Sequence, residues 1–220
     1  MKTRRKINIL KNEGYYLPLF NLNGMVSSIT PFFSGDLKKG YYNYALKPVS
    51  ETDLFNLTDK RNVLFFVNNK RYDLNGQMEW QQEDKITYEI SQLKQIVERT
   101  NDLFVLTTKS FVAVDDNLEV HEIIIKNISK EILNINTVTS FPFYSRSPEN
   151  IFDHRHVTSL LNKVEIKENT IINKPTLSFD ERGHKENNVI YTFSAISNKT
   201  KPNNYVPVLD DYINGGSYSY

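Results

Sequence analysis

The clearest fold signal is the segment LEVHEIIIKNISKEILNINTVT, which spans residues 118–139. Residues 118–127 and 132–139 alternate, over most of their length, between apolar and polar side chains. An alternation with a period of two is typical of a half-buried β-strand. Because the short polar segment Ser129-Lys130-Glu131 separates the two runs, the sequence predicts that they pair as an antiparallel hairpin.

Short strand signals continue on both sides of this segment. Clusters such as Asn68-Asn69, Asn75-Gly76 and Asp115-Asp116-Asn117 mark turns between apolar runs. No part of the sequence carries a sustained helical apolar stripe. We therefore predict a mainly β fold, a large antiparallel β-sandwich, with further strands at residues 62–67, 72–80, 85–90, 93–99, 103–107, 111–114, 158–166, 174–180 and 188–195.

The two ends of the chain differ in composition from its middle. The sandwich is predicted to span residues 1–198, a length that buries enough surface to fold without disulfides or metals. Residues 199–220 contain Pro202, Pro207 and Gly215-Gly216 and are predicted to form a linker or tail. We therefore expect the domain to belong to a longer protein.

Charge and cysteine content exclude several classes of protein. Lys and Arg total 27 and Asp and Glu total 26, so the net charge of +1 gives no general attraction for nucleic acid or anionic lipid. Without cysteine there are no disulfides, thiolate metal sites or cysteine nucleophiles. The basic residues 1–6 are not followed by the apolar segment of a secretion signal, and no run is long enough to span a membrane. We expect a cytoplasmic protein without nucleic-acid or membrane partners.

The densest polar cluster is Asp153-His154-Arg155-His156. In an extended segment His154 and His156 point to one face, which is half of a typical metal site. The other histidines, His121 and His184, lie far away in sequence, so no third ligand can be named. We favour a hydrogen-bonded structural cluster, or a loop that faces a neighbouring domain.

A second polar cluster occupies residues 178–184. Asp180 and Glu181 are candidates for an acid and base pair in glycoside chemistry. Adjacent residues of a strand point to opposite faces, so a charged strand end followed by a turn at Gly183 is the favoured interpretation. Ser145 and Ser159 lack the strand, elbow and helix pattern of a hydrolase nucleophile.

Aromatic residues are abundant, with 13 Tyr, 13 Phe and one Trp. Sugar sites place aromatic rings against C–H faces and use a few polar groups to bind the hydroxyls. The core of a β-sandwich also uses aromatic residues, and core packing is the favoured interpretation. An exposed platform formed by Trp80, or by Tyr41 and Tyr42, is the feature expected of a stand-alone carbohydrate-binding module.

Four segments carry a family resemblance: YLPLFNLNGMVSSITPFFSGD (16–36), YSRSPEN (144–150), DHRHVTSLLN (153–162) and KPTLSFDERGH (174–184). They resemble the N-terminal region of glycoside phosphorylases of glycoside hydrolase family 94. The resemblance covers residues 16–195. It is closest to the 1,2-β-oligoglucan phosphorylase branch, with cellobiose phosphorylases as further relatives. It implies a large opening sandwich of the galactose mutarotase-like, or supersandwich, type.

The resemblance also implies where such an enzyme performs its chemistry. In the family, linker helices and an (α/α)6 barrel follow the sandwich, and the barrel holds a catalytic Asp and inorganic phosphate. Phosphate attacks the anomeric carbon with inversion and releases a sugar 1-phosphate. The 220 residues contain no barrel segment. We therefore expect the chain to be inactive alone and to need no cofactor beyond the phosphate used by the parent enzyme.

The leading prediction is a non-catalytic sandwich that supports a homodimer and the rim of a barrel active site. Arg155, His156 and Arg182 are expected to face a β-glucan oligosaccharide or the barrel, because arginine binds hydroxyls and carboxylates in a fixed fork. No catalytic residue and no metal ligand is assigned. The alternatives are the carbohydrate-binding module and a small enzyme that uses Asp180, Glu181 or two histidines.

Overall fold

The computed structural model describes residues 5–7, 16–49, 61–91, 93–148, 162–180, 183–197 and 200–207. Within them the chain is mainly β and is built from several antiparallel sheets, which confirms the predicted fold class and is consistent with a β-sandwich. The chain forms two compact units: unit 1 comprises residues 1–40 and 48–142, and unit 2 comprises residues 41–47 and 143–220. The domain boundary at residue 198 stays a prediction. None of the helical segments in the described ranges is long and apolar enough to cross a membrane.

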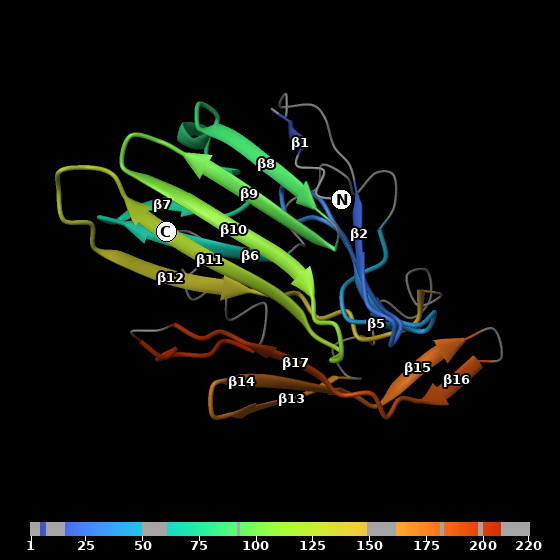
Figure 1. The fold of residues 1–220 in the computed structure, drawn as a ribbon. Coiled ribbons are helices and arrows are strands. Elements are labelled where there is room, and N and C mark those ends of the chain that lie inside the picture. The colour runs from blue at the N-terminus through green and yellow to red at the C-terminus, as the bar shows by residue number, and fades with distance from the viewer. Residues whose placement is uncertain are drawn as a thin grey trace. The chain divides into compact units, whose positions relative to one another are not determined.

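The largest sheet of unit 1 has five strands (Figure 1). Their order is β1 (Arg5–Ile7), β8 (Lys85–Ser91), β9 (Lys94–Thr100), β10 (Phe104–Val112) and β11 (Glu119–Asn127), and all neighbours are antiparallel. Along β10, every second residue from Phe104 to Val112 is buried. This strict period of two gives the sheet one inward face and one outward face.

A three-stranded sheet supplies the other side of the core. It consists of β12 (Ile135–Ser140), β6 (Asn62–Val67) and β7 (Lys70–Asp73) in that order. Strand β6 buries Leu64 as well as its neighbours Val63 and Phe65, so it is covered on both faces. The ring of Tyr72 meets the ring of Phe104 edge to face, with centroids 5.1 Å apart. The inward faces of the two sheets therefore meet in an apolar core.

A third sheet of unit 1 contains β2 (Leu17–Phe20), β3 (Met25–Ile29) and β4 (Leu37–Lys39), paired in antiparallel order. The turn before β3 is held by Asn21, whose side-chain oxygen accepts hydrogen bonds from the backbone of Asn23 and Met25. The connection from β3 to β4 passes through Gly35 at φ +124°, where an added Cβ would lie 1.7 Å from the carbonyl oxygen of Ser28. Only glycine fits this close approach of two backbone segments.

Unit 2 contains smaller sheets. Strands β13 (Asn162–Lys167), β14 (Thr170–Pro175) and β17 (Tyr191–Ser194) form one sheet, and β15 (Leu177–Asp180) and β16 (Gly183–Glu186) form another. The short strand β5 (Asn43–Tyr44) also belongs to this unit, and Tyr44 and Arg146 exchange two backbone hydrogen bonds of 2.9 and 3.2 Å. Buried Asn173 donates a hydrogen bond to the hydroxyl of Ser145.

The predicted hairpin of residues 118–139 is wrong in its pairing. Both segments form strands, but β11 pairs with β10 and β12 pairs with β6 in the other sheet. The reason is a long-range contact: the backbone N–H of Asn68 donates to the carbonyl of Asn134 at 2.9 Å, and its side-chain oxygen accepts from the N–H of Asn134 at 3.0 Å. The turn between β6 and β7 thus holds the start of β12 away from β11.

The run at residues 72–80, predicted as strand broken by a turn at Asn75-Gly76, has the turn but is strand only before it. Strand β7 ends at Asp73, and Trp80 lies in the short 3-10 turn η2 (Glu79–Gln81). The side chain of Gln81 replaces a strand partner at this point. It accepts from the N–H of Asp73 at 2.8 Å and donates to its carbonyl at 3.0 Å. Because this amide satisfies both backbone groups, the ladder needs no further strand there.

Replacing Gly35 with alanine tests the close approach of β3 and β4. The new methyl group would overlap a backbone carbonyl, so we expect Gly35→Ala to lower the free energy of unfolding by about 3 kcal/mol. Gly24→Ala is the matched control, because Gly24 also has a positive φ but has open space around its Cα. We expect it to cost about 1 kcal/mol. Urea unfolding measures both values, and equal losses would contradict the steric explanation.

Candidate functional site

The residues predicted from sequence to form a site lie mostly outside the described part of the chain. Arg155, His156 and Arg182 are among them, as are Glu181 and the remainder of the cluster at 153–156. The backbone of Asp180 ends β15 opposite Gly183. Their proposed roles therefore stay predictions. Within the described ranges, no three histidine or carboxylate side chains come together in a way that could hold a metal ion.

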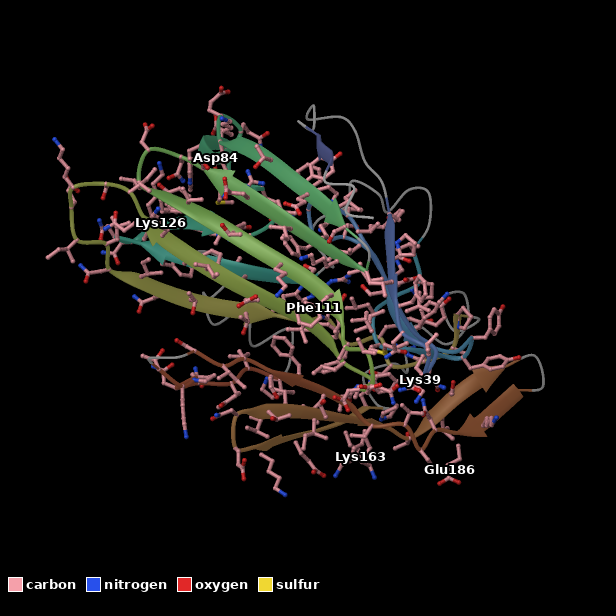
Figure 2. All side chains as sticks on the ribbon, in the orientation of Figure 1. Lys39, Asp84, Phe111, Lys126, Lys163 and Glu186 are labelled. Atoms are coloured by element: carbon pink, nitrogen blue, oxygen red, sulfur yellow. The ribbon has the colours of Figure 1, made fainter. Side chains whose placement is uncertain are left out.

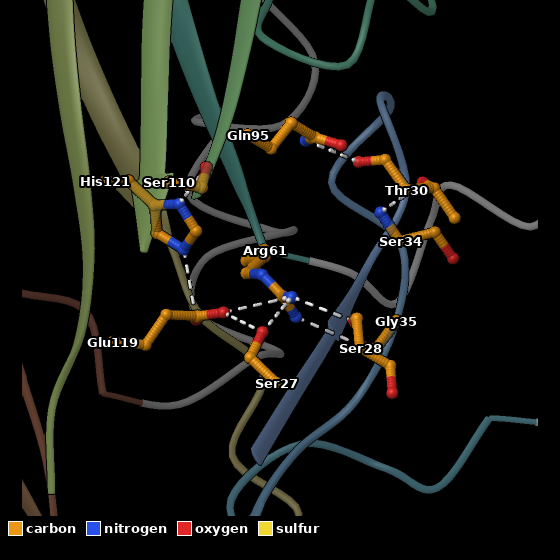
Figure 3. Close-up of polar contacts among 10 residues, drawn as sticks. All are labelled: Ser27, Ser28, Thr30, Ser34, Gly35, Arg61, Gln95, Ser110, Glu119 and His121. Carbon is orange, nitrogen blue, oxygen red and sulfur yellow. Dashed lines mark hydrogen bonds and ion pairs between the residues drawn. The ribbon is translucent and has the colours of Figure 1, made fainter. Parts of the chain in front are cut away.

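One group of described polar side chains in unit 1 gathers instead around a buried arginine (Figure 3). We call this group the Arg61 cluster, and its members are Ser27, Arg61, Ser110, Glu119 and His121. Arg61 directly precedes β6, Ser27 lies on β3, Ser110 lies on β10, and the other two lie on β11. The cluster therefore connects strands from three different sheets.

Arg61 is the centre of the cluster. Its Nη1 donates to the carbonyl oxygen of Gly35 at 3.1 Å, and its Nη2 donates to that of Ser28 at 3.2 Å. The same Nη2 lies 3.1 Å from Oε1 of Glu119, and both side chains are almost completely buried. The rigid fork of a guanidinium suits this arrangement, because it directs several N–H groups at fixed angles. One side chain thereby ties the start of β6 to the β3–β4 connection and to β11.

Glu119 is held as an anion. Burial alone would raise the pKa of its carboxyl, but the charge of Arg61, the contact with His121 and the hydroxyl of Ser27 outweigh burial and lower the pKa to about 2. Nε2 of His121 lies 3.0 Å from Oε2 of this carboxylate. A general acid or base works best with a pKa near the operating pH. Glu119 is therefore poorly suited to move protons at neutral pH and well suited to anchor charge.

His121 links Glu119 to Ser110, which is the same order of carboxylate, imidazole and hydroxyl as in a catalytic triad. Nδ1 of His121 lies 2.8 Å from Oγ of Ser110, and its ring is T-shaped to that of Phe33, with centroids 5.8 Å apart. In a triad the serine must reach a substrate from an exposed turn. Ser110 instead lies in the middle of β10 and has no exposed surface. The carboxylate, imidazole and hydroxyl therefore serve as an internal link between two strands.

The polar row continues along the inward face of the five-stranded sheet. Gln95 on β9, opposite Ser110 in the ladder, donates from its amide to the carbonyl of Thr30 at 3.2 Å. The hydroxyl of Thr30 accepts from the backbone N–H of Ser34 at 3.1 Å (Figure 3). This loop of residues 30–34 is thus fixed to the sheet by the same kind of contact that Arg61 makes. All these residues are buried, which is expected only for polar groups with partners.

Another buried ion pair of unit 1, Arg99 with Asp84, contacts η2. Nη1 of Arg99 is 3.6 Å from Oδ2 of Asp84 and donates to the carbonyl of Gln81 at 3.4 Å. Burial raises the pKa of the Asp84 carboxyl, against the opposing influence of Arg99. The guanidinium lies over Gly76, where an added Cβ would come within 2.1 Å of it. Such a tightly enclosed arginine positions the turn rather than a ligand.

Aromatic side chains reach the surface in both units. Trp80 of unit 1 is 42% exposed, its Nε1 donates to the carbonyl of Arg71 at 2.8 Å, and Nζ of Lys70 lies 4.8 Å from its ring centroid. In unit 2, Tyr41 and Tyr42 are exposed, with ring planes at 90° and centroids 4.9 Å apart. Perpendicular rings make no single flat platform. The indole of Trp80, held by its own hydrogen bond, is the flatter surface.

Sequence reasoning missed the Arg61 cluster, although part of the signal was present. Glu119 and His121 share the inward face of β11 with Ile123 and Ile125, as their register with β10 shows. A carboxylate at a core-facing position requires a partner, because burying an isolated charge is costly. Nothing in the sequence around Arg61 indicates that it is this partner.

Comparison with known proteins assigns no family. No family model matches the sequence, and no curated protein matches it either. What the chain does is therefore inferred from its residues and their geometry.

The low pKa of Glu119 predicts how stability depends on pH. With an ordinary value of 4.5 and a folded value of about 2, the ionised carboxylate stabilises the fold above pH 4.5. This contribution, on the order of 3 kcal/mol, is lost as the pH falls from about 4.5 to about 2. Urea unfolding of wild type and Glu119→Gln at pH 7, 4 and 3 should show their difference shrinking. The control is Glu98→Gln, whose side chain is exposed on β9. A difference that is constant with pH would contradict the assignment.

Proposed function

We propose that this chain is a non-catalytic β domain of a cytoplasmic β-glucan or oligosaccharide phosphorylase. It supports the assembly of the enzyme and contributes to the rim of an active site on a separate barrel domain. The family resemblance of residues 16–195 motivates the substrate class and the reaction, which is inverting phosphorolysis to a sugar 1-phosphate. No catalytic role is proposed for the residues of this chain.

The observation that carries the proposal is the internal pairing of the Arg61 cluster. The acid, base and hydroxyl that come together in unit 1 are Glu119, His121 and Ser110; they contact one another in that order, and Glu119 also pairs with Arg61. Glu119 stays ionised, and Ser110 is enclosed. These groups hold sheets in place, which is the task of a supporting domain.

The surface of the domain then provides the contacts to its partners. Arg155, His156 and Arg182 remain the residues that we propose for the barrel or the oligosaccharide. A guanidinium donates parallel hydrogen bonds to a carboxylate of the barrel or to neighbouring sugar hydroxyls. Inorganic phosphate is bound by the barrel in this proposal and needs no site on the sandwich.

The proposal predicts that the chain alone releases no glucose 1-phosphate from β-1,2-gluco-oligosaccharides and inorganic phosphate. Adding a barrel domain as a separate protein should give activity and a complex that survives gel filtration. Arg155→Glu combined with Arg182→Glu should weaken that complex, whereas Lys163→Glu, on an exposed part of β13, should not. Sugar phosphate released by the chain alone would contradict a non-catalytic role.

A second candidate function is a stand-alone carbohydrate-binding module, and the exposed indole of Trp80 favours it. A fixed aromatic face can stack on the C–H face of a pyranose. The hydrogen bond from Nε1 to Arg71 orients the ring, and the amine of Lys70, which lies over one face of the indole, leaves the other face for a sugar and can itself donate to sugar hydroxyls.

This second function is tested by titrating the chain with soluble β-glucan and following tryptophan fluorescence. Trp80 is the single tryptophan, so any change reports on this surface alone. Binding predicts a saturable change that Lys70→Ala weakens, with Tyr41→Ala in unit 2 as the control that leaves it unchanged. A flat titration removes this function.

A further inference from the structure

Strand β11 forms one end of the five-stranded sheet of unit 1. It pairs along its whole length with β10, and none of the described strands pairs with its other edge. Its nine residues, EVHEIIIKN, contain no proline or glycine that would block pairing. Long regular edges of this kind are templates for another strand unless something prevents it.

The ladder shows which backbone groups point to the open edge. The backbone carbonyl of Leu118 accepts a hydrogen bond from Ala113, and the backbone N–H of Ile128 donates one to Leu103. The backbone N–H and C=O groups of the even-numbered residues therefore point toward β10. Backbone direction alternates along an antiparallel strand. The odd-numbered residues, with Ile123 and Ile125 at the centre, therefore direct their N–H and C=O groups away from the sheet.

On the outward face of β11, charged residues of opposite sign and then apolar residues lie at equal distances on either side of Ile124. Glu122 and Lys126 lie two residues on either side of Ile124, which is 54% exposed (Lys126 is labelled in Figure 2). Four residues on either side lie Val120 and Ile128, both apolar. This order of apolar, acidic, apolar, basic and apolar residues is complementary to itself when the strand is reversed.

We propose that the open edge of β11 pairs with β11 of a second copy of this chain, antiparallel, about a two-fold axis at Ile124. Glu122 then lies opposite the second copy's Lys126, and the symmetry repeats this pair. Ile124 meets its own counterpart, and Val120 lies opposite the second copy's Ile128. The two five-stranded sheets become one continuous sheet, as in an isologous dimer.

The charged side chains favour this pairing register over registers with the two-fold axis at another residue. An axis at Glu122 or at Lys126 would set like charges directly opposite each other, which destabilises a strand pair. An axis at Ile123 would set Glu122 against Ile124 and leave Lys126 against Val120. Registers centred between residues would bring inward-facing side chains to the outward face. Lys109 on β10, whose Nζ is 3.3 Å from Glu122, completes a row of alternating charges across the interface.

This inference adds a surface and a register to the homodimer that the sequence led us to expect, and it involves no sugar. Its failure leaves the phosphorolysis test unaffected. The pairing also accounts for a hydrophobic residue as exposed as Ile124 in the middle of a regular strand.

A charge-swap series followed by sedimentation equilibrium tests the pairing. Lys126→Glu places two acidic side chains opposite each other at both symmetric pairs, so the dimer dissociation constant should rise about tenfold or more. Glu122→Lys should weaken the dimer in the same way, and the double variant Glu122→Lys with Lys126→Glu should restore it. Lys130→Glu, the same change in the exposed loop after β11, should have no effect. A monomeric wild type, or a dimer that none of these changes weakens, would overturn the proposal.

A cross-linking experiment tests the register directly. The chain has no cysteine. Ile124→Cys therefore places one thiol opposite its own counterpart at the axis, in a pair without hydrogen bonds, where Cα atoms lie about 4.5 Å apart. Mild oxidation should give a covalent dimer. Glu122→Cys, which faces the second copy's Lys126, should stay uncross-linked, and the reverse result would overturn the register.

Discussion

The buried pair between Arg61 and Glu119 constrains the rest of unit 1. Removing two charges from water is costly, and their attraction offsets the cost only when the remaining hydrogen-bonding groups are also satisfied. The two Nη groups of the guanidinium therefore require the carbonyl groups of Ser28 and Gly35 at their observed distances, and the carboxylate requires Ser27. Apolar contacts such as that of Tyr72 with Phe104 supply most of the burial, but they are less directional. The polar pair fixes how the sheets are aligned.

Because the charged groups of the Arg61 cluster pair with one another inside unit 1, we place the binding function of the domain at its surface. A carboxylate with a pKa of about 2 is ionised and a weak base at neutral pH, and an enclosed serine meets no substrate. Two features of the described part of unit 1 that are available for binding are the indole of Trp80 and the open edge of β11. A domain with a rigid polar interior and binding features on its outside suits a supporting role, which is why we propose one.

The alternation of apolar and polar residues predicted where strands occur better than it predicted which strands pair. The alternation of residues 85–90 and 93–99 predicted β8 and β9, because a period of two records that one face is buried. The same pattern could not show that β11 and β12 belong to different sheets, since the contact between Asn68 and Asn134 joins residues far apart in sequence. Inward-facing Glu119 signalled a buried partner without identifying it. The candidate residues Arg155, His156 and Arg182 lie outside the described ranges and stay predictions.

Native-state amide hydrogen exchange tests most directly whether the Arg61 cluster joins the sheets. If it does, the slowest amides of β3, β6 and β11 open with one shared free energy, because the strands separate together. Arg61→Met should then lower the protection of β3 and β11 by the same amount. The account would be contradicted if the amides of β3 opened at a much lower free energy than those of β11 in the wild type and if Arg61→Met did not change that free energy.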